Sequence, residues 1–419
     1  MESTSPAQPA NVTQGVPLLE GLRVLDLSTM IAAPLAATIL ADYGAEVVKV
    51  EMPGAGDHVR KFGAQQEGEG LYWKALSRGK ASVALDLRHP DGKALLREWV
   101  SQFDVLIENF RPGTLERWDL APDELRTTHP GLIVLRVTAY GQDGPYSTQP
   151  GFGTLAEAMT GLASVSGFAD RPPLLPAYPL ADIMAGNLGA TAVLAALQRR
   201  HRTGEGDVID LAIYEAALKL IEINILEYQQ HGTEHGRSGN RYGPAAPRGS
   251  YQCNDGQWVA LSGTTQAMAV HVLRAIGGGD LVADPRFATN ALRRENVEEL
   301  DALISSWCAR RDRPTALAEL TAAGCAVGPL ETVATMLNNP QVVHRGSIAA
   351  VHDENLGDLA MTGAYPHFQA GGTVIGRPGP AAVGQDTDTV LARDLGLDKR
   401  DLARLRAAEV TGGPAHDLR

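Results

Sequence analysis

The stretch "LRVLDLSTMIAAPLAATILADYGAEVVKVE", residues 22–51, decides the fold. Its opening residues, 22–28, are apolar and partly β-branched, which predicts a strand. Residues 33–44 predict a helix with Pro34 in its first turn, and residues 46–51 predict a second strand. Because a helix separates the two strands, we expect them to be parallel neighbours in a buried sheet.

The same alternation of strand and helix continues along the chain. Strands are expected at 81–87, 104–110 and 131–141, with a helix at 90–103 between the first two. The predicted fold class is therefore α/β, with a large doubly wound Rossmann-like domain and a smaller α+β domain. No GxGxxG motif follows the first strand and no GxxxxGKS/T loop occurs, so neither a redox dinucleotide cradle nor a phosphate loop is expected.

Glycine and proline punctuation gives the expected domain boundaries. A Gly/Pro-rich connection begins near residue 231, and Asn254-Asp255-Gly256 predicts a hairpin beyond it. Helices are expected near 265–276, 294–309 and 314–324, and a long amphipathic helix over 213–231. The expected divisions are a disordered tail at 1–18, the large domain at 19–230, a linker at 231–248, the small α+β domain at 249–335, and a linker with a return to the large domain at 336–419.

Composition and charge exclude several classes of partner. The chain has 419 residues and a formal net charge of −12, which argues against nucleic acid and anionic membranes as partners. Cys253, Cys308 and Cys325 lack ligand spacing, and His231 and His235 do not form HExxH, so no metal is expected. The N-terminus lacks the features of a signal peptide and no apolar run of about 18 residues is evident, so a cytoplasmic location is expected.

Asp182, in "PLADIMAG" at 179–186, is the first candidate site residue. An aspartate at the head of a small, apolar helix is usually an N-cap. The alternative is a carboxylate aimed into a site, because Ala185 and Gly186 leave space around it and a helix N-terminus favours the ionised form that a nucleophile needs. From the residues alone, both roles stay open.

The loop "ENFRPGTLERW", 108–118, is the second candidate. It follows a predicted strand, at the edge where open α/β sheets bind ligands. Asn109, Arg111 and Arg117 could hold a phosphate-bearing ligand, because guanidinium groups donate in a fixed fork. A structural turn followed by a short helix explains the same residues equally well.

Six segments of the chain carry a resemblance: "GLRVLDLSTMIAAPLAATILADYGAEVVKVEMPGAGD", "LYWKALSRGKASVALDLRHPDGKALL", "DVLIENFRPGTLERWDL", "PLADIMAG", "DPRFATNALRRENVEEL" and "GQDTDTVLARDLGL". Together they resemble the class III CoA-transferase family, which includes formyl-CoA transferase and carnitine CoA-transferases. The resemblance implies that Asp182 is the nucleophile and that acyl transfer passes through an aspartyl-CoA thioester. It also implies an acyl-CoA donor and a carboxylic acid acceptor as partners, no permanently bound cofactor, and an interlocked homodimer.

The resemblance also implies a set of CoA contacts. Met52 stands where formyl-CoA transferase has an arginine near the adenine, so adenine stacking is not expected there. Ile31, where that enzyme has a glutamine, suggests an acyl group other than formyl or oxalyl. The positions that match the family's CoA-binding residues are Ile31, Ala32, Leu85, Arg88, Asn109, Phe110, Arg111 and Arg117.

Three alternatives accompany the CoA-transferase hypothesis. An acyl-CoA racemase or isomerase shares the fold, but racemases of the family place a histidine where this chain has Phe152, which cannot abstract a proton. An intramolecular CoA-transferase would use the same nucleophile. A CoA-binding module without catalysis would keep Arg88 and Arg117 but would need no carboxylate at position 182.

Overall fold

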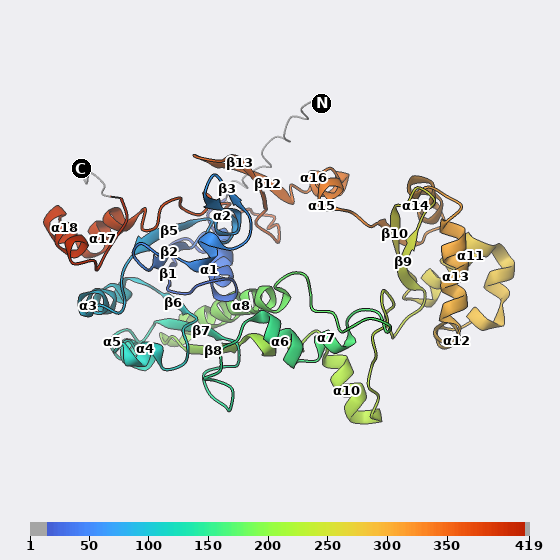
Figure 1. Ribbon diagram of the computed structural model, residues 1–419, viewed down its shortest axis with the longest axis horizontal. Helices are drawn as coiled ribbons and strands as arrows, with labels where there is room; N and C mark the ends of the chain where they lie inside the picture. The colour runs from blue at the N-terminus through green and yellow to red at the C-terminus, as the bar shows by residue number, and fades with distance from the viewer. Residues whose placement is uncertain (1–14, 415–419) are drawn as a thin grey trace. The chain divides into compact units, whose positions relative to one another are not determined.

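Figure 1 shows the computed structural model, which describes residues 15–414. Residues 1–14 of the expected tail lie outside this range. The Leu18 backbone N–H donates to the Gly372 carbonyl (3.0 Å), so regular backbone hydrogen bonding begins just before the expected boundary at residue 19.

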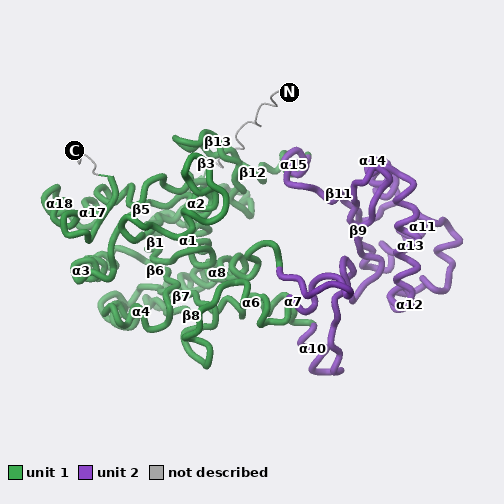
Figure 2. Tube along the Cα trace, viewed as in Figure 1, with its two compact units in different colours: residues 1–162, 176–223, 340–419 green, residues 163–175, 224–339 purple. Residues whose placement is uncertain are grey.

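The chain forms two compact units, coloured separately in Figure 2. Unit 1 combines residues 1–162, 176–223 and 340–419, and unit 2 combines 163–175 and 224–339. The C-terminal segment therefore returns to the first unit. Unit 2 begins earlier than the expected small domain and also takes a short piece from the middle of the expected large domain.

Unit 1 is built on a six-stranded sheet in which all neighbouring strands are parallel, so the predicted α/β class is confirmed. The order β5-β2-β1-β6-β7-β8 places the first strand of the sheet in the middle, and the chain reverses direction across the sheet between β1 and β6. The strands are β1 (Arg23–Asp26), β2 (Glu46–Glu51), β5 (Lys80–Ala84), β6 (Val105–Glu108), β7 (Ile133–Thr138) and β8 (Val208–Ala212).

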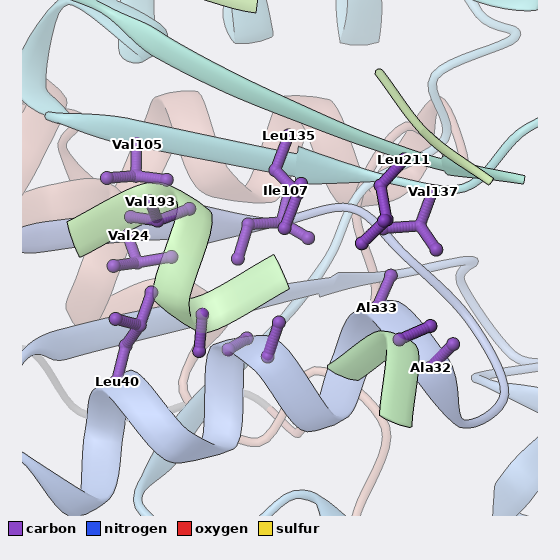
Figure 3. Close-up of a cluster of buried hydrophobic side chains, with 14 of the residues drawn as sticks. Val24, Ala32, Ala33, Leu40, Val105, Ile107, Leu135, Val137, Val193 and Leu211 are labelled. Carbon is purple, nitrogen blue, oxygen red and sulfur yellow. The ribbon is translucent and has the colours of Figure 1, made fainter. Parts of the chain in front are cut away.

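Apolar side chains cover both faces of this sheet. On one face, α1 (Ala32–Asp42) and α8 (Leu180–Thr203) pack on Val24, Ile107 and Leu135, as Figure 3 shows for part of the cluster. The opposite core gathers side chains such as Trp99 and Leu106 with those of the C-terminal helices. The elements around that second core include α3 (Pro90–Trp99), η2 (Val100–Gln102), α4 (Thr114–Arg117), α5 (Pro122–Thr128), α17 (Thr387–Leu395) and α18 (Lys399–Ala407).

Helix α8 approaches α1 closely because small residues line the contact. A Cβ on Gly186 would lie 2.9 Å from the Ala32 carbonyl oxygen, so only glycine fits without a shift. By length and composition α8 is also the one helix of the described chain that could cross a membrane, so the expectation that no apolar run is long enough was wrong. Its buried small residues pack against α1 and the sheet, which accounts for the apolar composition.

The remaining elements of unit 1 are short. The hairpin β12 (Ile348–Asp353) and β13 (Gly357–Thr362) is antiparallel, as is the small pair β3 (Gln65–Gln66) and β4 (Glu69–Gly70). The helices are η1 (His58–Lys61), α2 (Leu71–Leu76), α6 (Gly153–Met159), α9 (Ile213–Leu218) and α16 (Pro340–His344), and α7 (Leu162–Val165) begins at the boundary with unit 2.

Unit 2 has the mixed α and β content expected of the small domain. The predicted hairpin around Asn254-Asp255-Gly256 is confirmed as β9 (Arg248–Gln252) and β10 (Trp258–Ser262), and β11 (Ala326–Pro329) adds a third antiparallel strand. Its helices are α11 (Gln266–Ala283), η3 (Pro285–Phe287), α12 (Asn290–Glu295), α13 (Val297–Cys308), α14 (Arg313–Ala322) and α15 (Val333–Met336).

The prediction of a single long helix over 213–231 was wrong. The structure contains α9 and then α10 (Glu222–His231), because the N–H groups of Leu220 and Ile221 turn to carbonyls three residues back and end the first helix. This break lies close to the boundary between the two units, at residue 223.

Candidate active site

A cavity of about 280 Å³ opens at the carboxyl edge of the parallel sheet. It is lined by the loops after β1 and β6, the two strands between which the strand order reverses. Open α/β sheets bind ligands at this place because two neighbouring loops diverge there and leave a crevice. Asp182, at the start of α8, faces the same cavity.

Asp182 is not the N-cap of α8. The helix begins at Leu180, and Pro179 holds the cap position without a side-chain hydrogen bond. Asp182 is thus the third residue of the helix, and its carboxylate lines the cavity. The structural alternative left open by the sequence is removed, although this alone does not assign a role in catalysis.

The surroundings of Asp182 disfavour its negative charge. Burial and, second, the neighbouring Glu157 raise the pKa of Asp182 to about 6, while a hydrogen bond from the Gly153 backbone N–H acts in the opposite direction. The pKa of Asp182 is thus raised although the carboxylate lies in the first turn of a helix, because desolvation and a like charge act against ionisation. At pH 7 the group is still mainly ionised, but it is a more basic carboxylate than an exposed aspartate.

Helix α6 supplies both neighbours of Asp182. Gly153 is its first residue, and a Cβ there would lie 2.2 Å from Asp182 Oδ2, so only glycine allows this approach. Glu157, one turn further on, is 2% exposed, and its Oε1 accepts the Ala181 N–H at 3.1 Å. This helix therefore holds the first turn of α8 from its side.

The β1–α1 loop is held against the β6 loop by Asn109. Its Oδ1 accepts the Thr29 N–H at 2.8 Å, and its Nδ2 donates to the Thr29 carbonyl at 2.7 Å. Met30 follows with a left-handed φ of 68°, a conformation that costs a non-glycine residue about 1 kcal/mol or more. The loop then delivers Ile31 and Ala32 to the cavity wall.

A buried ionic cluster lies beneath this loop. Lys80 Nζ is 2.9 Å from Asp26, and Lys49 Nζ is 3.1 Å from Asp57, whose Oδ1 accepts the Met30 N–H at 3.2 Å. Burial disfavours the charged form of Asp26, but Lys49 and Lys80 more than compensate and hold its pKa below the usual value. These charges are paired and inaccessible, so we assign them to support of the loop.

Five of the eight expected CoA-contacting residues line the cavity with Asp182. They are Ile31, Ala32, Asn109, Phe110 and Arg111.

The other three expected contacts lie outside the cavity lining. Leu85 is 1% exposed and packs in the core, and its backbone pairs with Thr411. Arg88 and Arg117 are exposed surface cations, and Arg117 Nη2 donates to Thr114 Oγ1 at 2.9 Å. Contact with CoA stays a prediction for all eight residues.

Met52 occupies the position at which formyl-CoA transferase has an arginine near the adenine, and in this structure a cation from another residue lies beside it. Arg88 Nη2 lies 3.2 Å from Met52 Sδ, and the same guanidinium pairs with Asp86 at 3.0 Å. A basic group from the loop after β5 thus stands beside the residue that follows β2.

The structure gives no support for a metal centre. Among residues 15–414, no group of three or more His, Cys, Asp or Glu side chains could hold a metal ion. His235 Nε2 contacts the Glu227 carboxylate, and the three cysteines are free and buried.

Sequence analysis missed Glu157 and the left-handed Met30. The signal for Glu157 was a lone acidic residue within the apolar segment "LAEAM", 155–159, which marks a carboxylate carried into a packed interface. Met30 gave no signal, because its conformation is imposed by hydrogen bonds to residues distant in sequence.

The fold is an α/β fold whose parallel sheet carries a cavity at its switch point, and Asp182, a carboxylate with a raised pKa, lines that cavity. The sequence matches CoA-transferase family III over residues 19–387, and the chain belongs to this family. The protein is accordingly a CoA-transferase, as the sequence predicted.

Curated relatives span nearly the whole chain. A succinyl-CoA–D-citramalate CoA-transferase from Chloroflexus aurantiacus is 40% identical, covering 94% of this chain and 98% of its own. A succinyl-CoA:glutarate CoA-transferase from Mus musculus is 31% identical over 94% of this chain and 90% of its own. A crystal structure of a CAIB/BAIF family protein from Brucella suis, 30% identical, superposes with a TM-score of 0.80 over 91% of this chain and 100% of its own.

Proposed function

We propose that the protein transfers CoA from an acyl-CoA to a free carboxylate through a covalent aspartyl-CoA thioester on Asp182. The observation that carries the proposal is a solvent-reachable carboxylate in the cavity whose pKa is raised to about 6 by burial and by Glu157. Such a group is charged at neutral pH yet more basic than an ordinary aspartate, as a nucleophile requires.

The first half-reaction moves CoA onto the enzyme. An Asp182 oxygen attacks the thioester carbonyl, the C–S bond breaks, and CoA leaves as a thiolate. The donor acyl group and Asp182 are then joined as a mixed anhydride. The thiolate then attacks the aspartyl carbonyl and the anhydride C–O bond breaks, which releases the donor acid as its carboxylate. No proton is gained or lost, so the site needs no general acid.

The second half-reaction is the reverse with a new acid. The acceptor carboxylate attacks the aspartyl-CoA carbonyl, the thiolate leaves, and a second mixed anhydride forms. Attack of the thiolate on the acceptor's carbonyl carbon releases the new acyl-CoA and regenerates the Asp182 carboxylate. Each half-reaction exchanges one CoA thioester for another of similar energy, and covalent catalysis divides the transfer into easier steps.

For the substrates, we propose succinyl-CoA as donor and a dicarboxylate of four or five carbons as acceptor. Relatives named for succinyl-CoA with citramalate, malate or glutarate support this class. Arg111 lines the cavity and offers a guanidinium for a distal carboxylate or a CoA phosphate. A homodimer belongs to the same proposal, and sedimentation velocity would test it.

The isomerase alternative receives no support from the cavity. Racemisation needs a base on each face of the α-carbon, and Asp182 is the one carboxylate among the described residues that line the cavity. Phe152 stands at the position that the resemblance assigned to a second base, and no described histidine lines the cavity.

Isotope transfer tests the proposed chemistry. The protein is incubated with succinyl-CoA and ¹⁸O-carboxylate-labelled citramalate, malate or glutarate in separate reactions. An accepted acid should give its CoA ester and pass ¹⁸O through Asp182 into the succinate released in later turnovers. Acyl-CoA exchange without label in succinate would contradict the anhydride route, and CoA binding without exchange for any donor and acceptor would favour a binding module.

A further inference from the structure

The first turn of α8 lacks a cap of its own. Pro179 holds the cap position without a side-chain hydrogen bond, and the Ala181 N–H that follows belongs to a fully buried residue. A buried N–H with no acceptor destabilises the fold, so this group needs a partner from elsewhere. Glu157 Oε1 provides it at 3.1 Å.

Glu157 is an unusual choice for this task. An amide or hydroxyl oxygen could accept the same hydrogen bond without placing a second carboxylate beside Asp182. Glu157 is 2% exposed, and none of the ion pairs found among the described residues involves Glu157 or Asp182. Other buried carboxylates of unit 1 do have such a partner, for example Glu108, which lies 2.6 Å from Arg136.

We propose, on the basis of the function proposed above, that Glu157 is a positioning residue: it fixes the first turn of α8 and repels the charge of Asp182, which makes that carboxylate a better nucleophile. Acylation converts Asp182 into a neutral anhydride or thioester, so the repulsion is present before attack and relieved afterwards. Glu157 therefore favours both formation and accumulation of the aspartyl-CoA intermediate.

Gly153 completes the arrangement from the same helix. Residues four apart lie on one face of a helix, so Gly153 and Glu157 both face the first turn of α8. The Gly153 N–H donates to the Asp182 carboxylate and fixes its direction, while Glu157 accepts the Ala181 N–H and repels the charge of Asp182. In this proposal Gly153 orients the Asp182 carboxylate, and Glu157 makes it more reactive.

The charged and titratable groups near Asp182 are few. Glu157 faces it from α6, and Tyr72 of α2 is close enough for Asp182 to raise the pKa of its phenol, after burial. Arg111 and Tyr140 line the same cavity. Of these, Glu157 is the group whose removal should lower the pKa of Asp182 and move the acid limb of the reaction to lower pH.

The test compares Glu157→Gln, which keeps the acceptor oxygen but removes the charge, with Glu157→Ala and with Glu98→Gln. Glu98 is an exposed residue of α3 and controls for the loss of one negative charge. For Glu157→Gln we expect kcat/KM at pH 7 to fall by about tenfold, its acid limb to move to lower pH, and the aspartyl-CoA fraction at a fixed donor concentration to decrease. Glu98→Gln should match the wild type in all three.

A double-mutant cycle in thermal stability gives a readout that needs no substrate. At pH 8, Asp182→Asn should raise Tm in the wild-type background and raise it less in the Glu157→Gln background, because the repulsion has already been removed. An unchanged acid limb together with additive Tm changes would overturn the role of Glu157. If the wild type forms no adduct with any donor, the proposed function fails, and the cycle still decides whether Glu157 repels Asp182.

Discussion

Asp26 and Asp182 are two carboxylates near the same edge of the same sheet, and their surroundings are opposite. Asp26 is completely buried, yet Lys49 and Lys80 hold its pKa below the usual value, although burial acts against them. Asp182 is less buried, has Glu157 instead of a cation beside it, and its pKa is raised to about 6 by burial first and by Glu157 second. Burial alone therefore does not decide whether the pKa of a carboxylate is raised or lowered.

Asp26 belongs to a paired ionic cluster beneath the cavity wall, whereas Asp182 has no cation beside it. Lys49 holds Asp57 at 3.1 Å, and Asp57 accepts the Met30 N–H, so the paired cluster fixes the loop that forms one cavity wall. Asp182 has no cation beside it and lines the cavity, as the proposed nucleophilic role requires. Buried charges are tolerated in proteins when paired, so an unpaired one at a ligand-binding edge indicates function.

Replacing Asp182 should give the largest effect on activity. Asp182→Asn keeps the size and a hydrogen-bond acceptor but removes the nucleophile, so we expect kcat to fall by about 10³-fold or more. Steady-state transfer from succinyl-CoA, measured with a binding assay for CoA, checks this. A variant that binds CoA and keeps more than a tenth of the wild-type kcat would show that the two carboxylates do not differ in the proposed way.

Breaking the paired cluster should act on stability. Lys49→Met leaves Asp57 and part of the charge of Asp26 buried without a partner, so the free energy of unfolding should fall by about 3–5 kcal/mol. Denaturant unfolding of the variant and of Lys49→Met/Asp57→Asn checks this, and the double variant should recover part of the loss. A loss below about 1 kcal/mol would mean that the cluster is not needed for support.

Crowding the nucleophile should lower the rate without removing the charge. In Gly153→Ala the new Cβ would lie within 2.2 Å of Asp182 Oδ2, so the carboxylate must turn away from its present direction. We expect kcat to fall by about 10–100-fold with the affinity for CoA nearly unchanged. Gly279→Ala, in α11, is a control for glycine-to-alanine substitution on a helix outside the cavity, because an added Cβ meets nothing within 4 Å there and the backbone φ is not left-handed.

The pH dependence of stability should differ in sign between the two carboxylates. The folded-state pKa of Asp182, about 6, exceeds its ordinary value of 3.8, so the native state binds this proton more tightly than the unfolded state. Its ionisation therefore lowers stability as pH rises from about 4 to 6. Asp182→Asn should be more stable than the wild type by about 1–3 kcal/mol above pH 6 and equally stable below pH 4. Unfolding curves at pH 4 and pH 8 check this, and a variant less stable at pH 8 would contradict the prediction.

Local patterns in the sequence were enough for five of the six strands of the parallel sheet, whereas the role of Asp182 as nucleophile was implied only by the family resemblance. The strand at 46–51 was predicted with the bounds of β2, because apolar periodicity and a preceding glycine are local signals. The position of Asp182 in the chain also marked it as a candidate. Its environment could not be predicted in this way, because Glu157 and Gly153 reach it only through the packing of α6 on α8.

The errors have the same origin. One long helix was expected over 213–231 because the helical pattern of the sequence is continuous there. The helix is interrupted between α9 and α10 by backbone hydrogen bonds near the boundary between the two units. The apolar run of α8 was judged too short to span a membrane, although it is long enough by length and composition. Its small apolar residues are explained by the close packing of α8 on α1.

The central claim is that Asp182 carries CoA during turnover, and intact-mass spectrometry tests it most directly. The protein is incubated with succinyl-CoA and a panel of other acyl-CoAs, quenched in acid, and weighed beside Asp182→Asn. We expect a CoA-sized adduct that hydroxylamine removes, that maps to the peptide containing Asp182, and that the variant lacks. An adduct of equal yield in Asp182→Asn, or steady turnover with no adduct under any quenching condition, would contradict the account.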